Sequence, residues 1–254
     1  MNNPERAGRV PWNFIAIGLA AICSTFIASS AWERVKMKPP ERTIEVTGSA
    51  KKRIVSDLIE WSANLETRNM DRSQAVRDLA AHVETTRKYL LKEGVKKNEI
   101  RVSSVSVEEE YDTEYAGVAE ERIERQIFRG YHVYQMITVS SKDVALVERL
   151  SRESTMLLET GVPISSMSPS YYYTKLGELK IEMLAAAATD ARERATNILS
   201  KAGGARIERL KSADMGVINV NPANSTGTSW DGNNDTSSLE KDIITIVHVV
   251  FELE

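Results

Sequence analysis

The stretch GYHVYQMITVSSKDVALVERL, residues 130–150, contains both repeating patterns from which this chain is built. In its first half, alternate residues share one face of an extended strand: Tyr131, Val133, Gln135, Ile137 and Val139. After Asp143 the spacing becomes helical as far as Thr160, with Gly161 expected to end the helix. The apolar side of that helix is formed by Val144, Val147, Leu150, Leu157 and Leu158. A strand followed directly by an amphipathic helix predicts a domain that mixes sheets with helices.

The chain on the amino-terminal side repeats these patterns. Period-two alternation predicts strands over residues 44–49, 59–65 and 100–107. Between the second and third strands the apolar spacing is helical, with Asp71 as the expected N-cap and Gly94 just beyond the helix end. That helix face comprises Val76, Leu79, Ala80, Val83 and Leu90.

On the carboxyl-terminal side, residues 164–174 are strand-like and residues 176–201 predict the longest helix. Its expected inner face is Ile181, Leu184, Ala185, Ala188, Ala195, Ile198 and Leu199, and so much alanine indicates close packing on a sheet. Strands over residues 207–220 and 243–253, separated by a polar loop, complete the order ββαββαβαββ. The prediction is an α+β fold of helices packed on mostly antiparallel sheets, not a doubly wound one.

Residues 12–32, WNFIAIGLAAICSTFIASSAW, form an uncharged stretch of 21 residues after Arg6 and Arg9. A helix of roughly 20 apolar residues crosses a bilayer. We interpret the stretch as a transmembrane anchor or uncleaved signal, because its apolar run exceeds the h-region of about 7 to 15 residues in a cleavable signal peptide. Cleavage after Ala31 is the alternative.

Both interpretations export the rest of the chain. Residues 1–11 are then a cytoplasmic tail or n-region, residues 33–42 a Pro-containing linker, and residues 43–254 the exported domain. We therefore expect a single span in the inner membrane, through residues 12–32, with the bulk of the chain in the periplasm or outside the cell.

Composition argues against several functional classes. A formal net charge of −3 provides no basic field for nucleic acid. Cys23, the only cysteine, lies in the apolar stretch, so the exported part has no thiol nucleophile, disulfide or thiolate metal site. No HExxH, GxSxG, GxGxxG or GxxxxGK[ST] motif occurs. We expect no enzymatic activity, cofactor or metal.

Four groups of residues are weak candidates for a site. His82, His132 and His248 are far apart in sequence, and each is interpreted as a half-buried ring with a local partner. The acidic tract fits a solvated hairpin extension better than a cation site. It comprises Glu108, Glu109, Glu110, Asp112 and Glu114, followed by Glu120, Glu121 and Glu124.

The other two groups lie nearer the carboxyl terminus. Asp231, Asn233, Asp235 and Asp242 echo positions 1, 3, 5 and 12 of a calcium-binding EF-hand loop, but Thr236 replaces the turn glycine, and a disordered or mobile polar loop is the preferred interpretation. Tyr171, Tyr172 and Tyr173 on a strand must point to both faces of a sheet, which leaves packing, self-association or a ligand platform open.

Four segments resemble the SIMPL-domain family of bacterial envelope proteins. IEVTGSAKK at residues 44–52 is similar to its opening strand, SDLIEWSANLE at 56–66 to its second strand, residues 130–150 to its central block, and ATDARERATNILSKAGG at 188–204 to its helix end. The chain departs from the family pattern at Lys51, Lys52 and Arg53 and in the loop 219–238. The resemblance implies an envelope domain, often self-associating, loosely linked to stress tolerance and without an agreed catalytic site.

Two functional classes follow. The first is a non-enzymatic, membrane-anchored module that assembles with itself or with other envelope proteins, where the anchor raises the effective concentration of weak contacts. The alternative is a periplasmic small-ligand or cation-binding protein, or an enzyme, whose site is assembled from residues scattered in sequence.

Overall fold

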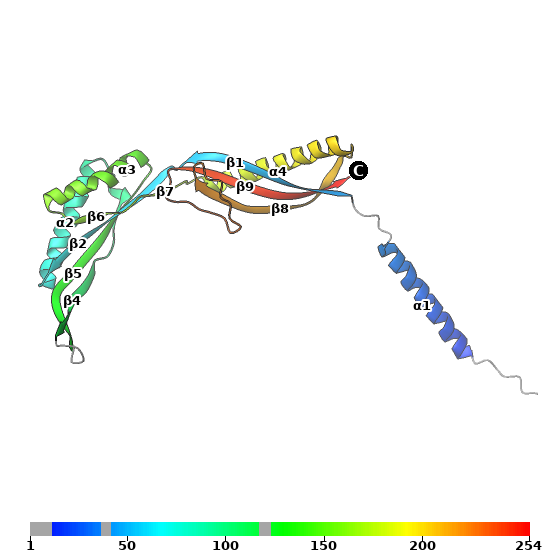
Figure 1. The fold of residues 1–254 in the computed structure, drawn as a ribbon, viewed down its shortest axis with the longest axis horizontal. Coiled ribbons are helices and arrows are strands. Elements are labelled where there is room, and N and C mark those ends of the chain that lie inside the picture. The colour runs from blue at the N-terminus through cyan, green and yellow to red at the C-terminus, as the bar shows by residue number, and fades with distance from the viewer. Residues whose placement is uncertain (1–11, 37–41, 117–122) are drawn as a thin grey trace, which may run out of the picture. The chain divides into compact units, whose positions relative to one another are not determined.

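The computed structural model describes residues 12–36, 42–116 and 123–254. The chain folds as two compact units. One comprises Met1–Glu45, Ala195–Ser212 and Val250–Glu254, and the other comprises Val46–Arg194 and Ala213–Val249. The predicted α+β class is confirmed, since four α-helices accompany two sheets among the described residues (Figure 1).

The larger sheet has six strands in the second unit: β2 (Leu58–Asn69), β3 (Ile100–Val102), β4 (Ser106–Ala116), β5 (Ile123–Ser141), β6 (Ile164–Ser166) and β7 (Ser170–Tyr172). Every pairing in it is antiparallel, and the register of β2 on β5 runs from Ile59 opposite Ser141 to Asn69 opposite Tyr131. β3 and β4 pair successively with β5, so the single strand expected over residues 100–107 is two strands.

Helices α2 (Arg72–Lys92) and α3 (Val144–Glu153) pack on one face of this sheet (Figure 1). Asp71 caps α2 through its side chain, and Gly94 has a φ of 104°, as the sequence predicted. The predicted helix over residues 143–160 is α-helical only to Glu153, because Ser154–Thr160 tightens into a 3-10 helix ended by Gly161 at a φ of 82°.

The core beneath these helices comes from alternate residues of β2 and β5. Trp61 is fully buried, and its indole nitrogen donates to Ser166 Oγ at 2.9 Å. The same core contains Ile59, Ala63, Leu65, Leu79, Leu90, Val133, Ile137, Val139, Val147 and Leu150. The period-two pattern therefore predicted the inward faces of β2 and β5 correctly. The helical pattern was correct except at Ala80 and Leu158, which are exposed.

The second sheet has the order β1 (Thr43–Val55), β9 (Glu240–Leu253), β8 (Ile207–Pro222), and α4 (Leu176–Ala202) runs along it (Figure 1). A Cβ on Gly48 of β1 would lie 2.1 Å from the carbonyl oxygen of Ala187 and 2.6 Å from the amide nitrogen of Ala191. Strand and helix approach this closely only because a glycine meets alanines, which confirms the close packing expected from the alanine content.

The expected inner face of α4 was wrong at most positions, although Ala195 is buried as expected. The buried residues are Leu179, Met183, Ala187, Ala191 and Ala195, whereas Ile181 is 73% exposed and Ile198 is 50% exposed. Helical periodicity favours a face of large apolar residues, but the approach to Gly48 selects small ones. Most of the apolar residues that the sequence placed on one face of α4 are exposed to solvent instead of packed on the sheet.

Helix α1 (Trp12–Lys36) belongs to the first unit. Within the described residues it is the one helix whose length and composition suit a membrane span, with the candidate span at Ala16–Glu33, and a signal sequence passes the same criterion. Its large apolar side chains are more than half exposed: Ile17, Leu19, Ile22, Phe26 and Ile27. The remaining parts of the predicted tail and linker, residues 1–11 and 37–41, lie outside the described residues.

Candidate functional site

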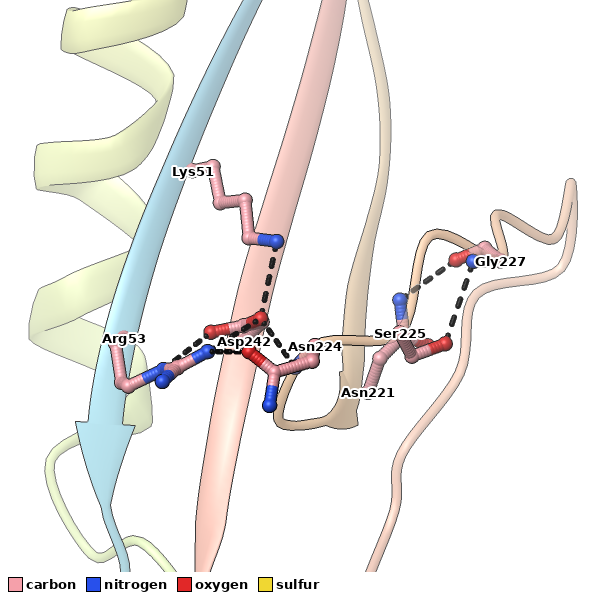
Figure 2. A network of polar contacts seen from close by, with 7 residues as sticks. All are labelled: Lys51, Arg53, Asn221, Asn224, Ser225, Gly227 and Asp242. Carbon is pink, nitrogen blue, oxygen red and sulfur yellow. Dashed lines mark hydrogen bonds and ion pairs between the residues drawn. The ribbon is translucent and has the colours of Figure 1, made fainter.

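A polar cluster gathers around Asp242 on β9, where β1 and the β8–β9 loop meet it (Figure 2). The Asp242 side chain is only 1% exposed, yet it pairs with two basic side chains of β1. Arg53 donates from Nε at 2.9 Å and from a terminal nitrogen at 3.2 Å, and Lys51 Nζ lies 3.0 Å away. The backbone amide of Asn224 donates to the same carboxylate at 2.8 Å.

These donors determine the protonation of the cluster. Hydrogen bonds from Arg53 and Lys51, with the Asn224 amide, hold the pKa of Asp242 well below its usual range, although burial acts in the opposite direction. The hydrogen bond and charge of Asp242 likewise raise the pKa of Arg53. Asp242 is therefore a carboxylate whose acceptor capacity is already used, a poor general base and a poor metal ligand.

Three asparagines organise the β8–β9 loop, residues 223–239. Asn219 accepts from the Ser229 amide at 2.9 Å, Asn221 donates to the Gly227 carbonyl at 2.6 Å, and Asn233 donates to Asn221 at 2.9 Å. The sequence predicted a disordered or mobile loop here. The structure instead shows a loop held along its length, because amide side chains replace missing backbone partners.

The EF-hand echo does not assemble into a site. Asp242 is bound by Arg53 and Lys51, while Asp235 pairs with Lys241 and accepts from Ser237 Oγ at 2.7 Å. The amide of Asp231 instead bonds Ser229 Oγ. Within the described ranges, no group of three His, Cys, Asp or Glu residues is arranged to hold a metal ion.

Lys241, next to Asp242, is buried on the opposite side of β9, with a side chain 2% exposed. Its amine donates to the backbone carbonyl of Asp235 and lies 3.6 Å from Asp235 Oδ2. Burial lowers the pKa of Lys241, partly offset by the Asp235 charge. Burial alone would raise the pKa of Asp235, but hydrogen bonds from Ser237 and Ser238, with the Lys241 charge, lower it overall.

The three tyrosines border the same region. Tyr171 is 8% exposed and belongs to the larger core, Tyr172 is 38% exposed, and Tyr173 packs against the core beneath α4. The expectation that they point to both faces is confirmed. They also line a cavity of about 100 Å³ that is bounded by Asp235 and Lys241.

Two of the three histidines gather near Glu66. His132 lies 3.0 Å from Glu66 Oε2, and His82 lines an open depression of about 350 Å³ together with Glu66 and Asp78. Hydrogen bonds from Arg68 and then from His132 lower the pKa of Glu66. His248 instead contacts Thr47 Oγ1 at 3.0 Å in the other sheet. His132 and His248 thus each have the local partner that the sequence analysis expected.

The acidic tract is β4 and the start of β5, so the hairpin extension is confirmed. Four of its carboxylates accept hydrogen bonds: Glu108 from Tyr134, Glu109 from Tyr111, Glu110 from Arg68 and Asp112 from Arg129. Tyr111, Phe128 and Tyr131 stack edge to face along it. Glu120 and Glu121 lie outside the described residues.

Sequence reasoning missed Lys51, Arg53 and Lys241. A signal existed, because Lys51, Lys52 and Arg53 were the point at which the chain departed from the family pattern. The structure gives each of these three departing residues an ion pair. Lys51 and Arg53 pair with Asp242, and Lys52 pairs with Glu182 of α4 at 2.7 Å. Lys241 carried no such signal, since a lysine in a strand is normally exposed.

Comparison with known proteins and protein families shows which family this chain belongs to. No curated protein matches the chain. The model of the family described as SIMPL, protein of unknown function (DUF541), matches residues 44–244, most of the chain and all of the cluster around Asp242. The chain belongs to the SIMPL family.

Proposed function

We propose that this protein is a membrane-anchored, non-enzymatic module of the cell envelope that assembles with copies of itself, and with other envelope proteins, at the membrane surface. α1 is the anchor in the inner membrane, and the remainder acts in the periplasm or outside the cell. The exposed apolar side chains of α1 support this, because lipid is the partner that such a helix requires. A link to stress tolerance rests on the family resemblance alone.

The observation that carries the assembly proposal is the edge strand β8. Residues 208–217 are exposed without interruption, so both faces of the strand are uncovered over ten positions. Leu210 is 56% exposed, Met215 66% and Val217 41%. A long, uncovered edge strand with apolar side chains is a template for pairing with another chain.

The β8–β9 loop defines the limits of that edge. Val220 donates to the Asn233 carbonyl at 2.8 Å and accepts from the Asp235 amide at 3.0 Å, so the last residues of β8 are already paired. Trp230 on this loop is 91% exposed. An exposed tryptophan beside the outer strand of a sheet suits a protein contact, since tryptophan is enriched among residues that dominate binding energy.

The absence of an evident reaction centre among the described residues favours an interaction role. His132, His248 and the Asp242 carboxylate have local partners, and the best-defined polar cluster holds a loop in place. The second sheet has β1 at one edge and β8 at the other. One copy of the protein therefore offers two strand edges to neighbouring copies. Confinement by α1 then raises the effective concentration of weak edge contacts.

Light scattering coupled to size exclusion tests this on the full-length protein extracted from its membrane, with Met215→Lys as the disrupting variant. A charged lysine on the edge should lower the association constant at least about tenfold, because edge lysines oppose strand pairing. Met70→Lys is the matched control, since Met70 is 64% exposed but lies between β2 and α2. A wild-type protein that is monomeric at every concentration, or equal effects of the two variants, would contradict the proposal.

A further inference from the structure

A small cavity lies where β7, the start of α4 and the β8–β9 loop meet. Its apolar sides are formed by Tyr171, Tyr172, Tyr173, Leu176 and Val220. Its polar end is formed by Asn234, Asp235, Thr236 and Lys241, of which Asp235 and Lys241 are the two charged groups. Its volume of about 100 Å³ equals roughly three water molecules at their share of the liquid. The cavity therefore suits a compact molecule and is too small for a benzene ring, which occupies engineered cavities of about 150 Å³.

The polar end of the cavity is incompletely satisfied by the protein. Lys241 has three donor hydrogens, and its described hydrogen bond goes to the backbone carbonyl of Asp235. Asp235 Oδ2 is buried without a hydrogen bond, and the amine lies 3.6 Å from it. A buried lysine and a buried carboxylate oxygen with unused capacity are costly for stability, so they indicate a site that something else completes.

The charges at this end select the class of ligand. One ammonium and one carboxylate balance, so an anion would be repelled by Asp235 and a cation by Lys241. The favoured ligand is neutral, with an acceptor for Lys241 Nζ and a donor for Asp235 Oδ2. A small hydroxycarbonyl compound has both groups, and a lysine desolvated in an apolar pocket is the form of lysine that attacks carbonyl carbon.

We propose that this cavity binds a small neutral carbonyl compound and that the Lys241 amine condenses with its carbonyl carbon. The amine attacks in its neutral form, after releasing one proton to water, and its lone pair forms the C–N bond as the carbonyl π bond breaks. The positively charged nitrogen then gives up a second proton, which Asp235 Oδ2 relays to the carbonyl oxygen, and a neutral carbinolamine results. Loss of that hydroxyl with one proton releases one water and leaves a C=N imine, with no net oxidation or reduction.

The test uses the full-length wild-type protein with glycolaldehyde and cyanoborohydride, which reduces any imine to a stable amine. Peptide mass spectrometry at low conversion then compares Lys241 with Lys88, whose side chain is 74% exposed. The cavity holds the aldehyde against the Lys241 amine, and burial lowers the pKa of that amine, which favours its neutral, reactive form. We therefore expect Lys241 to be labelled several-fold more than Lys88 at neutral pH.

A size control makes the result specific to the cavity. Benzaldehyde exceeds the available volume, so it should label Lys88 and leave Lys241 unmodified, and urea-unfolded protein should show the two lysines labelled about equally. Lys241 labelling at or below that of Lys88 with glycolaldehyde would overturn the proposal. Equal labelling of Lys241 by both aldehydes would also overturn it, because access would then come from opening of the fold. Neither readout depends on self-association.

Discussion

At the scale of single residues, Asp242 shows how a buried charge is tolerated. Two cations and one backbone amide surround it, and the loop residue that supplies the amide, Asn224, has a φ of 67°. Asparagine adopts this left-handed backbone more readily than most residues. The carboxylate thus fixes both β1 and the start of the β8–β9 loop.

Asp242→Asn should destabilise the protein at neutral pH, because the amide leaves Lys51 and Arg53 without a counter-charge. The pKa of Asp242 is depressed relative to 3.8 in the unfolded chain, so its pairing stabilises the fold above about pH 4 and is lost as the pH falls further. The midpoint temperatures of thermal unfolding of wild type and variant should therefore differ by several degrees at pH 7, and the difference should shrink toward pH 2. Asp214→Asn on exposed β8 is the control; a gap that is constant with pH would refute this account.

At the scale of elements, the contact between β1 and α4 depends on Gly48. Gly48→Ala places a methyl group 2.1 Å from a backbone oxygen, so strand and helix must separate. We expect a loss of about 1 to 3 kcal/mol in the free energy of unfolding, measured by urea titration. Gly177→Ala in the same helix has nothing within 4 Å and should stabilise by about 0.5 to 1 kcal/mol. Similar losses in both variants would show that the close approach is not the cause.

A second pair of variants tests which face of α4 packs on the sheet. Met183 is 2% exposed and Ile181 is 73% exposed. Met183→Ala should cost about 2 to 5 kcal/mol by opening a cavity, whereas Ile181→Ala should change stability by no more than about 0.5 kcal/mol. Chemical denaturation of the two variants distinguishes the faces, and the reverse order would restore the face expected from sequence.

At the scale of the whole molecule, the proposed anchoring through α1 predicts how association depends on concentration. In vesicles, contacts between anchored copies should follow their surface density, not their bulk concentration. Crosslinking yield should stay constant when the vesicles are diluted with buffer and fall several-fold when the protein-to-lipid ratio is lowered tenfold. A yield that follows buffer dilution instead would show that α1 does not retain the protein in the bilayer.

The sequence alone determined the α+β class, the inward faces of β2 and β5, most of the inward face of α2, the caps at Asp71 and Gly94 and the family. These depend on local periodicity and on short sequence signals. It also identified the apolar α1. For α3 it predicted the correct face but not the change to a 3-10 helix, which is a local response to packing.

Tertiary structure alone decided the rest. Which apolar face of α4 is buried depended on Gly48, a residue more than a hundred positions away, and the order of the loop depended on asparagines whose partners lie across that loop. The burial of Lys241 and Asp242 and the cavity beside the tyrosines required β1, β7, β8 and β9 to meet. Periodicity reports the neighbours of a residue along one element, whereas a polar cluster or cavity is set by contacts between elements distant in sequence.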